Sequence, residues 1–181
     1  MSWARGKMAP MARLFTLIAL VALGSQAPPA VKPSQHGTVM QQIAATTITV
    51  DYNRPVARGR ELFGALVPYD RVWCPGADDC TTITTSTDIT IEGRALPAGT
   101  YSVWAKPSAA TWIVILNRAH PIFHTRYQSV AEQDALTLEV TPRAGSHMET
   151  LAFYFPLVNA KHAELALHWG TVIVPLAIDV P

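Results

Sequence analysis

The stretch YSVWAKPSAATWIVILN, residues 101–117, carries the strongest signal for the fold. Two segments rich in aromatic and β-branched residues, YSVWAKP and TWIVILN, are separated only by the turn sequence Ser-Ala-Ala. This spacing is typical of a β-hairpin, in which a few turn-forming residues join two neighbouring strands. The stretch therefore predicts two adjacent antiparallel strands.

Segments on both sides of this hairpin show the alternation of apolar and polar residues that a half-buried strand requires. No segment after residue 30 has a sustained helical period. The pair Trp169-Gly170 is expected to join the last two strands. The expected strands are 46–52, 81–93 (one long strand or a bent pair), 135–142, 149–156, 163–169 and 171–178. About eight or nine short strands predict an all-β domain, either a single antiparallel β-sandwich or a flattened barrel.

The first 27 residues read as a signal peptide. Arg5, Lys7 and Arg13 precede the apolar run LFTLIALVAL, residues 14–23, and small and polar residues follow it. Ten residues are too few to cross a bilayer as a helix, so no membrane span is expected in the mature chain. The alternative is a buried core helix. We expect a signal peptide at 1–27, a Pro-rich linker or arm at 28–40, a β-sandwich domain at 41–181, and a periplasmic or secreted product.

The distribution of charge excludes one class of partner. All 13 acidic residues lie at or after Asp51, and removal of the leader leaves 11 basic residues against them, a net charge of −2. Such a balance gives no long-range attraction for nucleic acid. We therefore expect no nucleic-acid partner.

The two cysteines, Cys74 and Cys80, enclose the turn-forming segment PGADD. An exported protein meets an oxidising compartment, where a disulfide persists. A disulfide between them is the favoured prediction, and a metal pair or two free thiols are the alternatives.

Several short motifs occur in one order and with characteristic spacing. They are DYNRP (51–55), GRELFGALVPYDRVW (59–73), PGAD (75–78), TTIT (81–84), LPAGTYSVW (96–104) and TWIVILN (111–117). In these motifs the chain resembles the bacterial family called domain of unknown function 2911, over roughly residues 38–180. The resemblance implies an exported β-rich protein and brings no activity with it. Members often carry an arginine after the tryptophan of the second motif, where this chain has Cys74, so a role of that arginine does not transfer.

Tyrosine, arginine and tryptophan side chains gather in sequence around the irregular stretch that follows the first predicted strand. A guanidinium flanked by aromatic rings can bind a carboxylate or the face of a sugar. Alternatively, Arg54 and Arg60 hold the irregular connection against the sheet by pairing with a nearby acid, Asp51, Asp70, Asp78 or Asp79. The candidate ligand-binding residues are Tyr52, Arg54, Arg60, Tyr69 and Trp73.

A second candidate site is rich in histidine. His120 and His124 lie four residues apart around Pro121, and His147 and Glu149 lie two apart. If a loop brings the first pair together, three imidazoles and a carboxylate would suit zinc or another divalent transition metal. The alternative is that these are solvated surface residues, and no other cofactor is expected.

No standard catalytic motif is present, including GxSxG, HExxH and a Gly-rich phosphate loop. The leading hypothesis is an exported ligand-binding or cell-envelope-associated module whose partner is a small molecule, a glycan or an envelope component. The alternatives are a metal-dependent hydrolase that uses the His/Glu site, and a purely structural envelope protein.

Overall fold

A computed structural model describes Met1 and residues 34–181 of the chain. The predicted signal peptide and most of the predicted arm lie outside the described residues. The first strand begins at Gln35, inside the stretch 28–40 that we expected to be an arm.

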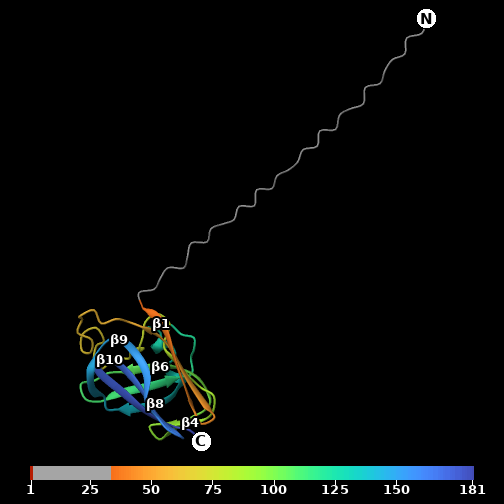
Figure 1. Ribbon diagram of the computed structural model, residues 1–181. Helices are drawn as coiled ribbons and strands as arrows, with labels where there is room; N and C mark the ends of the chain where they lie inside the picture. Colours follow the sequence, from red (N-terminus) through yellow and green to blue (C-terminus); the bar gives the residue numbers. More distant parts are fainter. Residues whose placement is uncertain (2–33) are drawn as a thin grey trace. The chain divides into compact units, whose positions relative to one another are not determined.

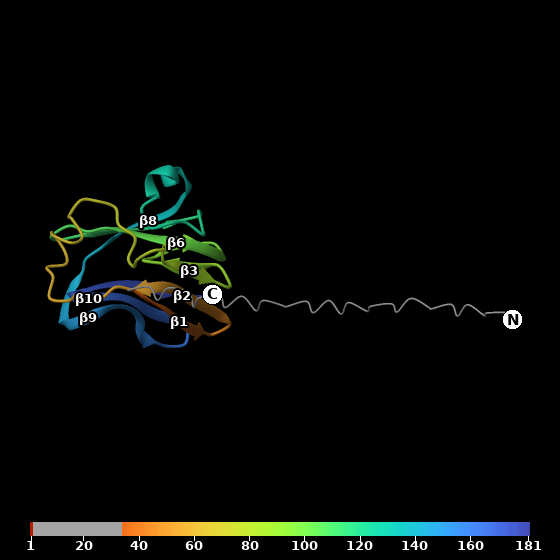
Figure 2. The same cartoon turned by 90° about the horizontal axis from the view of Figure 1, so that it is seen from above.

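Residues 34–181 form the predicted antiparallel β-sandwich, with one sheet of six strands and one of four. Figure 2 shows β6 and β8 in one layer and β9 and β10 in the other. In the six-stranded sheet the order is β1 (Gln35–Ile43), β2 (Thr46–Arg54), β3 (Thr82–Thr85), β6 (Gly99–Lys106), β7 (Trp112–Asn117) and β8 (Asp134–Val140). The four-stranded sheet has the order β5 (Arg94–Leu96), β4 (Ile89–Ile91), β10 (His162–Asp179) and β9 (Arg143–Val158).

The hairpin predicted from residues 101–117 is confirmed as β6 and β7, which pair from Ser102–Asn117 to Lys106–Ile113. The predicted segment 81–93 is a bent pair whose halves belong to different sheets. β3 pairs with β2 and β6, whereas β4 pairs with β5 and β10. The turn between Thr85 and Ile89 thus carries the chain from one layer to the other.

The final two predicted strands are one continuous strand. Trp169 and Gly170 both lie inside β10, the long strand labelled in Figure 1, which pairs with β9 and, near its end, with β4. The pairing with β9 shifts register on both sides of Gly170, whose φ is +58°. A β-bulge with glycine in the left-handed region bends a strand without ending it, which explains why the pair resembled a tight turn.

Side chains from both sheets meet in the main core between the layers, including Val103, Val114, Leu165 and Trp112. A second, smaller core lies on the other face of β6 and β7, where Trp104 and Ile115 pack with Cys74 and Cys80. In β6 and β7, residues of both alternating sets are therefore buried. This second core positions the disulfide loop, and with it one wall of the pocket described next.

The described part of the chain contains no α-helix, only the 3₁₀ turns Tyr127–Ser129 and Ala131–Gln133. It also contains no helix long and apolar enough to cross a membrane.

Candidate functional site

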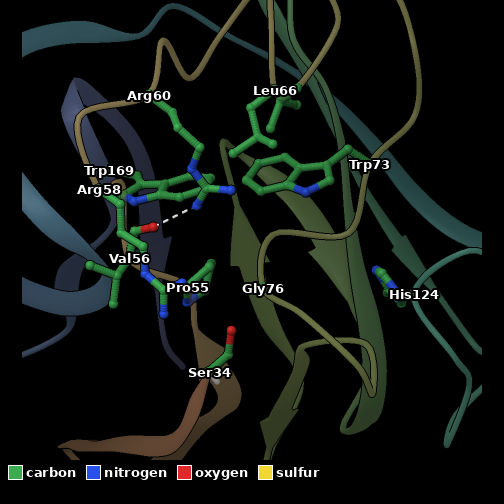
Figure 3. Close-up of a pocket in the computed structure, with 11 residues that line it drawn as sticks. Ser34, Pro55, Val56, Arg58, Arg60, Leu66, Trp73, Gly76, His124 and Trp169 are labelled. Carbon is green, nitrogen blue, oxygen red and sulfur yellow. Dashed lines mark hydrogen bonds between the residues drawn. The ribbon is translucent and has the colours of Figure 1, made fainter. Parts of the chain in front are cut away.

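A pocket of about 380 Å³ opens where the irregular connection 55–80 passes over β10 and the loop that carries His124. Two cationic side chains, Arg58 and Arg60, share its lining with Leu66, Trp73 and Trp169 (Figure 3). Its volume is at the lower end of the range of about 300–1,000 Å³ that small-molecule sites occupy.

The two arginines are presented by a tight turn that β9 holds in place. The N–H of Ala57 donates to the carbonyl of Glu149 (2.7 Å), and the N–H of Arg58 donates to the Glu149 carboxylate (2.6 Å). Arg58 and Gly59 both have positive φ, +53° and +68°. A non-glycine residue in this region is uncommon and strained, so the anchoring to Glu149 stabilises a conformation that the chain alone disfavours.

Arg60 is fixed by its own turn. Its Nε donates to the carbonyl of Ala57 (2.9 Å), and its Nη2 donates to that of Val56 (2.7 Å), the bond drawn in Figure 3. Both bonds hold the guanidinium at the pocket and leave some of its five N–H donors for another acceptor.

Two indole rings form the aromatic part of the lining. The rings of Trp73 and Trp169 are nearly parallel, with 15° between their planes and 6.1 Å between centroids. Phe63 packs edge-on against both. Trp73 pairs with Ala105 of β6 through two backbone hydrogen bonds, and Trp169 Nε1 donates to the carbonyl of Glu149 (3.3 Å). Trp73 belongs to the connection 55–80 and is bonded to β6, whereas Trp169 belongs to β10, so the course of the connection brings the two rings together.

Glu149 organises this region electrostatically. One of its oxygens accepts from the N–H of Arg58, and the other lies 2.9 Å from Nε2 of His147. The hydrogen bond with His147, followed by that from Arg58, lowers the pKa of the Glu149 carboxyl. An ionised carboxylate with both oxygens engaged serves as an anchor for the turn.

The structure brings together two of the five candidate ligand-binding residues, Arg60 and Trp73. Tyr52 is buried in the main core, edge-on to Phe153. Arg54, the last residue of β2, donates through Nε to the carbonyl of Leu151 in β9 (3.2 Å). Tyr69 lies outside this pocket, but it lines a separate hollow together with Arg60 and Trp169.

The four candidate metal ligands are not gathered. His147 and Glu149 contact each other, but residues 34–181 contain no group of three or more His, Cys, Asp or Glu side chains able to hold a metal ion. His124 lines the pocket, on a loop that pairs with the disulfide loop. The loop that contains His120 is joined to the disulfide loop by backbone hydrogen bonds, from Cys80 N–H to the Ile122 carbonyl and from His124 N–H to the Asp78 carbonyl. The described residues therefore do not form the candidate four-residue site, which the sequence left open beside solvated surface residues.

Sequence reasoning missed Arg58, Leu66 and Trp169 as pocket residues. The alternation Arg58-Gly59-Arg60 was an available signal for the first, since glycine between two arginines marks a turn that can present both. Trp169 is only 3% exposed and reads as a core residue, and nothing in the local sequence links it to Trp73.

The predicted disulfide is confirmed. Cys74 and Cys80 are bonded, with 5.8 Å between their Cα atoms. Two residues inside the loop matter for the pocket. The carbonyl of Ala77 accepts from Nδ2 of Asn53 in β2 (2.6 Å), and Gly76 lines the pocket. A Cβ on Gly76 would lie 3.0 Å from Thr81 Oγ1 and 3.3 Å from the carbonyl oxygen of Asn53, so the loop packs closely against β2.

Comparison with known proteins identifies a family and nothing further. The model of a family described as a protein of unknown function (DUF2911) matches residues 34–178. No curated protein and no solved structure matches significantly.

Proposed function

This chain belongs to the DUF2911 family, and on that premise we propose that it is an exported module that binds a small molecule in the Arg58–Trp169 pocket. The single observation that carries the proposal is the convergence of two guanidinium groups and two nearly parallel indoles on one open pocket. A few placed polar groups beside apolar walls are the usual composition of a small-molecule site.

Two energetically unfavourable features of the pocket also support a binding role. Arg58 occupies a strained backbone conformation, and Leu66 keeps 42% of its surface exposed. Strained residues cluster at ligand sites, where the surrounding structure over-determines them. A purely structural envelope component needs neither feature.

Export is supported by two independent features. The sequence begins with a basic and then apolar leader, and the folded domain contains a disulfide. Disulfides persist in oxidising compartments and are rare in the cytosol. Mass spectrometry of the cell-envelope and medium fractions tests this part: we expect a processed chain that carries the Cys74–Cys80 bond.

A thermal-shift screen of neutral, cationic and anionic small molecules tests the binding role. A ligand present at 100 times its Kd stabilises the folded state by about 2.7 kcal/mol. The variant Leu66→Trp, which fills the pocket from an exposed position, should abolish the shift. Leu157→Trp is the matched control, because Leu157 is similarly exposed (48%) and lies outside the pocket lining.

Two results would contradict the binding role. One is the absence of any stabilising compound across the screen. The other is a shift that survives Leu66→Trp unchanged, which would place the binding elsewhere. A partner protein captured by both leucine variants alike, with no small-molecule response, would favour the structural envelope role.

A further inference from the structure

We infer that the ligand of this pocket is a small organic acid, with a carboxylate held by Arg58 and Arg60 and a flat apolar body packed beside Trp73 and Leu66. This inference rests on the proposed function and specifies the chemical class of its ligand.

The charged side chains that line the pocket favour an anionic ligand. No Asp or Glu side chain occurs among the described residues that line the pocket. Within residues 34–181, neither Arg58 nor Arg60 forms an ion pair with a side chain, whereas Arg143 is paired with Glu164. The Glu149 carboxylate lies beside this turn and interacts electrostatically with Arg60, but it is not part of the lining, and its two oxygens are engaged by the Arg58 N–H and His147. A cleft lined by one sign of charge attracts ligands of the other sign.

The Arg60 guanidinium is held in a binding position before any ligand arrives. The bonds of Arg60 to the carbonyls of Val56 and Ala57 fix its guanidinium before any ligand arrives. Fixing it in advance reduces the entropy lost on binding. Arg58 extends from the same turn, two residues away, and also lines the pocket; Figure 3 shows its side chain running past Val56 toward Pro55. A carboxylate has two oxygens, and the planar donors of guanidinium groups match that geometry.

Apolar side chains line the other part of the pocket. Val67 and the two indoles line the side of the pocket that adjoins the core, and the exposed Leu66 is also part of the lining. Indole faces favour flat rings and apolar surfaces over strongly hydrated groups. A ligand that satisfied only the arginines would leave this apolar surface in contact with water.

The pocket offers only a modest number of hydrogen-bond donors, which favours a carboxylate over a phosphoryl group as the ligand. The described lining contains no lysine, and two of the N–H donors of Arg60 are already used. A phosphoryl group carries more charge and three strong acceptors, and its sites normally add backbone N–H donors from a helix N-terminus or a Gly-rich loop.

Isothermal titration calorimetry with matched pairs tests the ligand class. The probes are phenylacetate, benzoate and indole-3-acetate, each compared with its neutral amide, and phenyl phosphate as the phosphoryl arm. We expect at least one acid to bind about tenfold or more tightly than its amide and than phenyl phosphate, as loss of a charge-assisted contact predicts.

The matched variants are Arg58→Gln and Arg71→Gln. Both positions are exposed arginines of the connection 55–80, but only Arg58 lines the pocket. Arg58→Gln should weaken binding of the acid about tenfold and leave binding of the amide unchanged. Arg71→Gln should change neither, and circular dichroism of each variant verifies that it is folded.

Failure of the organic-acid class and failure of the binding role give different results. If an amide binds as tightly as its acid and Leu66→Trp abolishes both, the organic-acid class is overturned while the binding role stands. If phenyl phosphate binds most tightly, the carboxylate is overturned in favour of a phosphoryl ligand. If no acid binds while a neutral or cationic compound from the screen does, the ligand class again falls alone. If nothing binds at all, both proposals fall.

Discussion

Among single residues, Glu149 of β9 links the four-stranded sheet to the pocket, through both its backbone and its side chain. Its backbone carbonyl accepts from Ala57 and from Trp169 Nε1, and its carboxylate accepts from Arg58. Sequence reasoning placed Glu149 in a metal site because its position beside His147 matched a ligand pattern. Instead, Glu149 anchors the strained turn at Arg58 and Gly59, and no local pattern in β9 predicts that this turn lies there.

The lowered pKa of Glu149 predicts a pH effect on stability. The folded state favours the ionised form, so its contribution is present above the unfolded-state pKa, close to 4.5, and is lost as the pH falls through the lowered folded value. We expect the urea midpoint of the wild type to fall more steeply than that of Glu149→Gln as the pH is lowered below 4.5. Parallel profiles would contradict this role of the carboxylate.

Tyr127 provides a second residue-level test. Burial, followed by a hydrogen bond to Asp134 (2.7 Å), raises the pKa of its phenol well above the ordinary value of 10.0. Asp134 also accepts from Asn117, so the three side chains fasten the segment that leads from β7 to β8.

Ultraviolet titration of the wild type minus that of Tyr127→Phe should reveal one phenol that ionises only far above pH 10. A difference signal that titrates near 10 would show that this hydrogen-bonded contact does not persist in solution.

Among the elements, the strands followed from the sequence and the connection 55–80 did not. Alternating residues such as Ile48 and Val50 report directly which face is buried. The connection has no period, and its course depends on partners far along the chain, such as Glu149 and Ala105. That is why Arg60 and Trp73 could be selected from their chemistry, whereas Trp169 could not be assigned as their neighbour.

The disulfide loop should contribute both stability and pocket order. A ring of this size removes unfolded-chain entropy worth about 2 kcal/mol. We expect reduction with dithiothreitol to lower the urea unfolding free energy by about that amount and to increase amide hydrogen exchange around Trp73 and Gly76. Unchanged exchange there would mean that the pocket wall is held without the bond.

The bulge in β10 is tested by a pair of glycine substitutions. Gly170 and Gly93 both have positive φ, but a Cβ on Gly170 would lie 2.8 Å from Leu62 Cδ1, whereas one on Gly93 would meet nothing within 4 Å. Alanine at either site should cost about 1–2 kcal/mol of backbone strain. Gly170→Ala should cost more than Gly93→Ala in chemical denaturation, because it also displaces Leu62, and equal costs would rule out that contact as a constraint.

For the whole molecule, the two layers supply complementary parts of one site. The six-stranded sheet fixes Trp73 through Ala105, and the four-stranded sheet provides Trp169 and Glu149. The sandwich was predictable because alternation is a local property of each strand. The site was not, because it is formed by residues that only the packing of the two sheets brings together.

The most direct test of this account is ¹⁹F NMR of the protein labelled with 5-fluorotryptophan, titrated with the acid that binds most tightly in calorimetry. Trp73 and Trp169 line the pocket, whereas Trp104 lies in the separate second core. We predict that the resonances of Trp73 and Trp169 shift with ligand while that of Trp104 stays in place. A bound acid that leaves Trp73 and Trp169 unshifted would contradict the account.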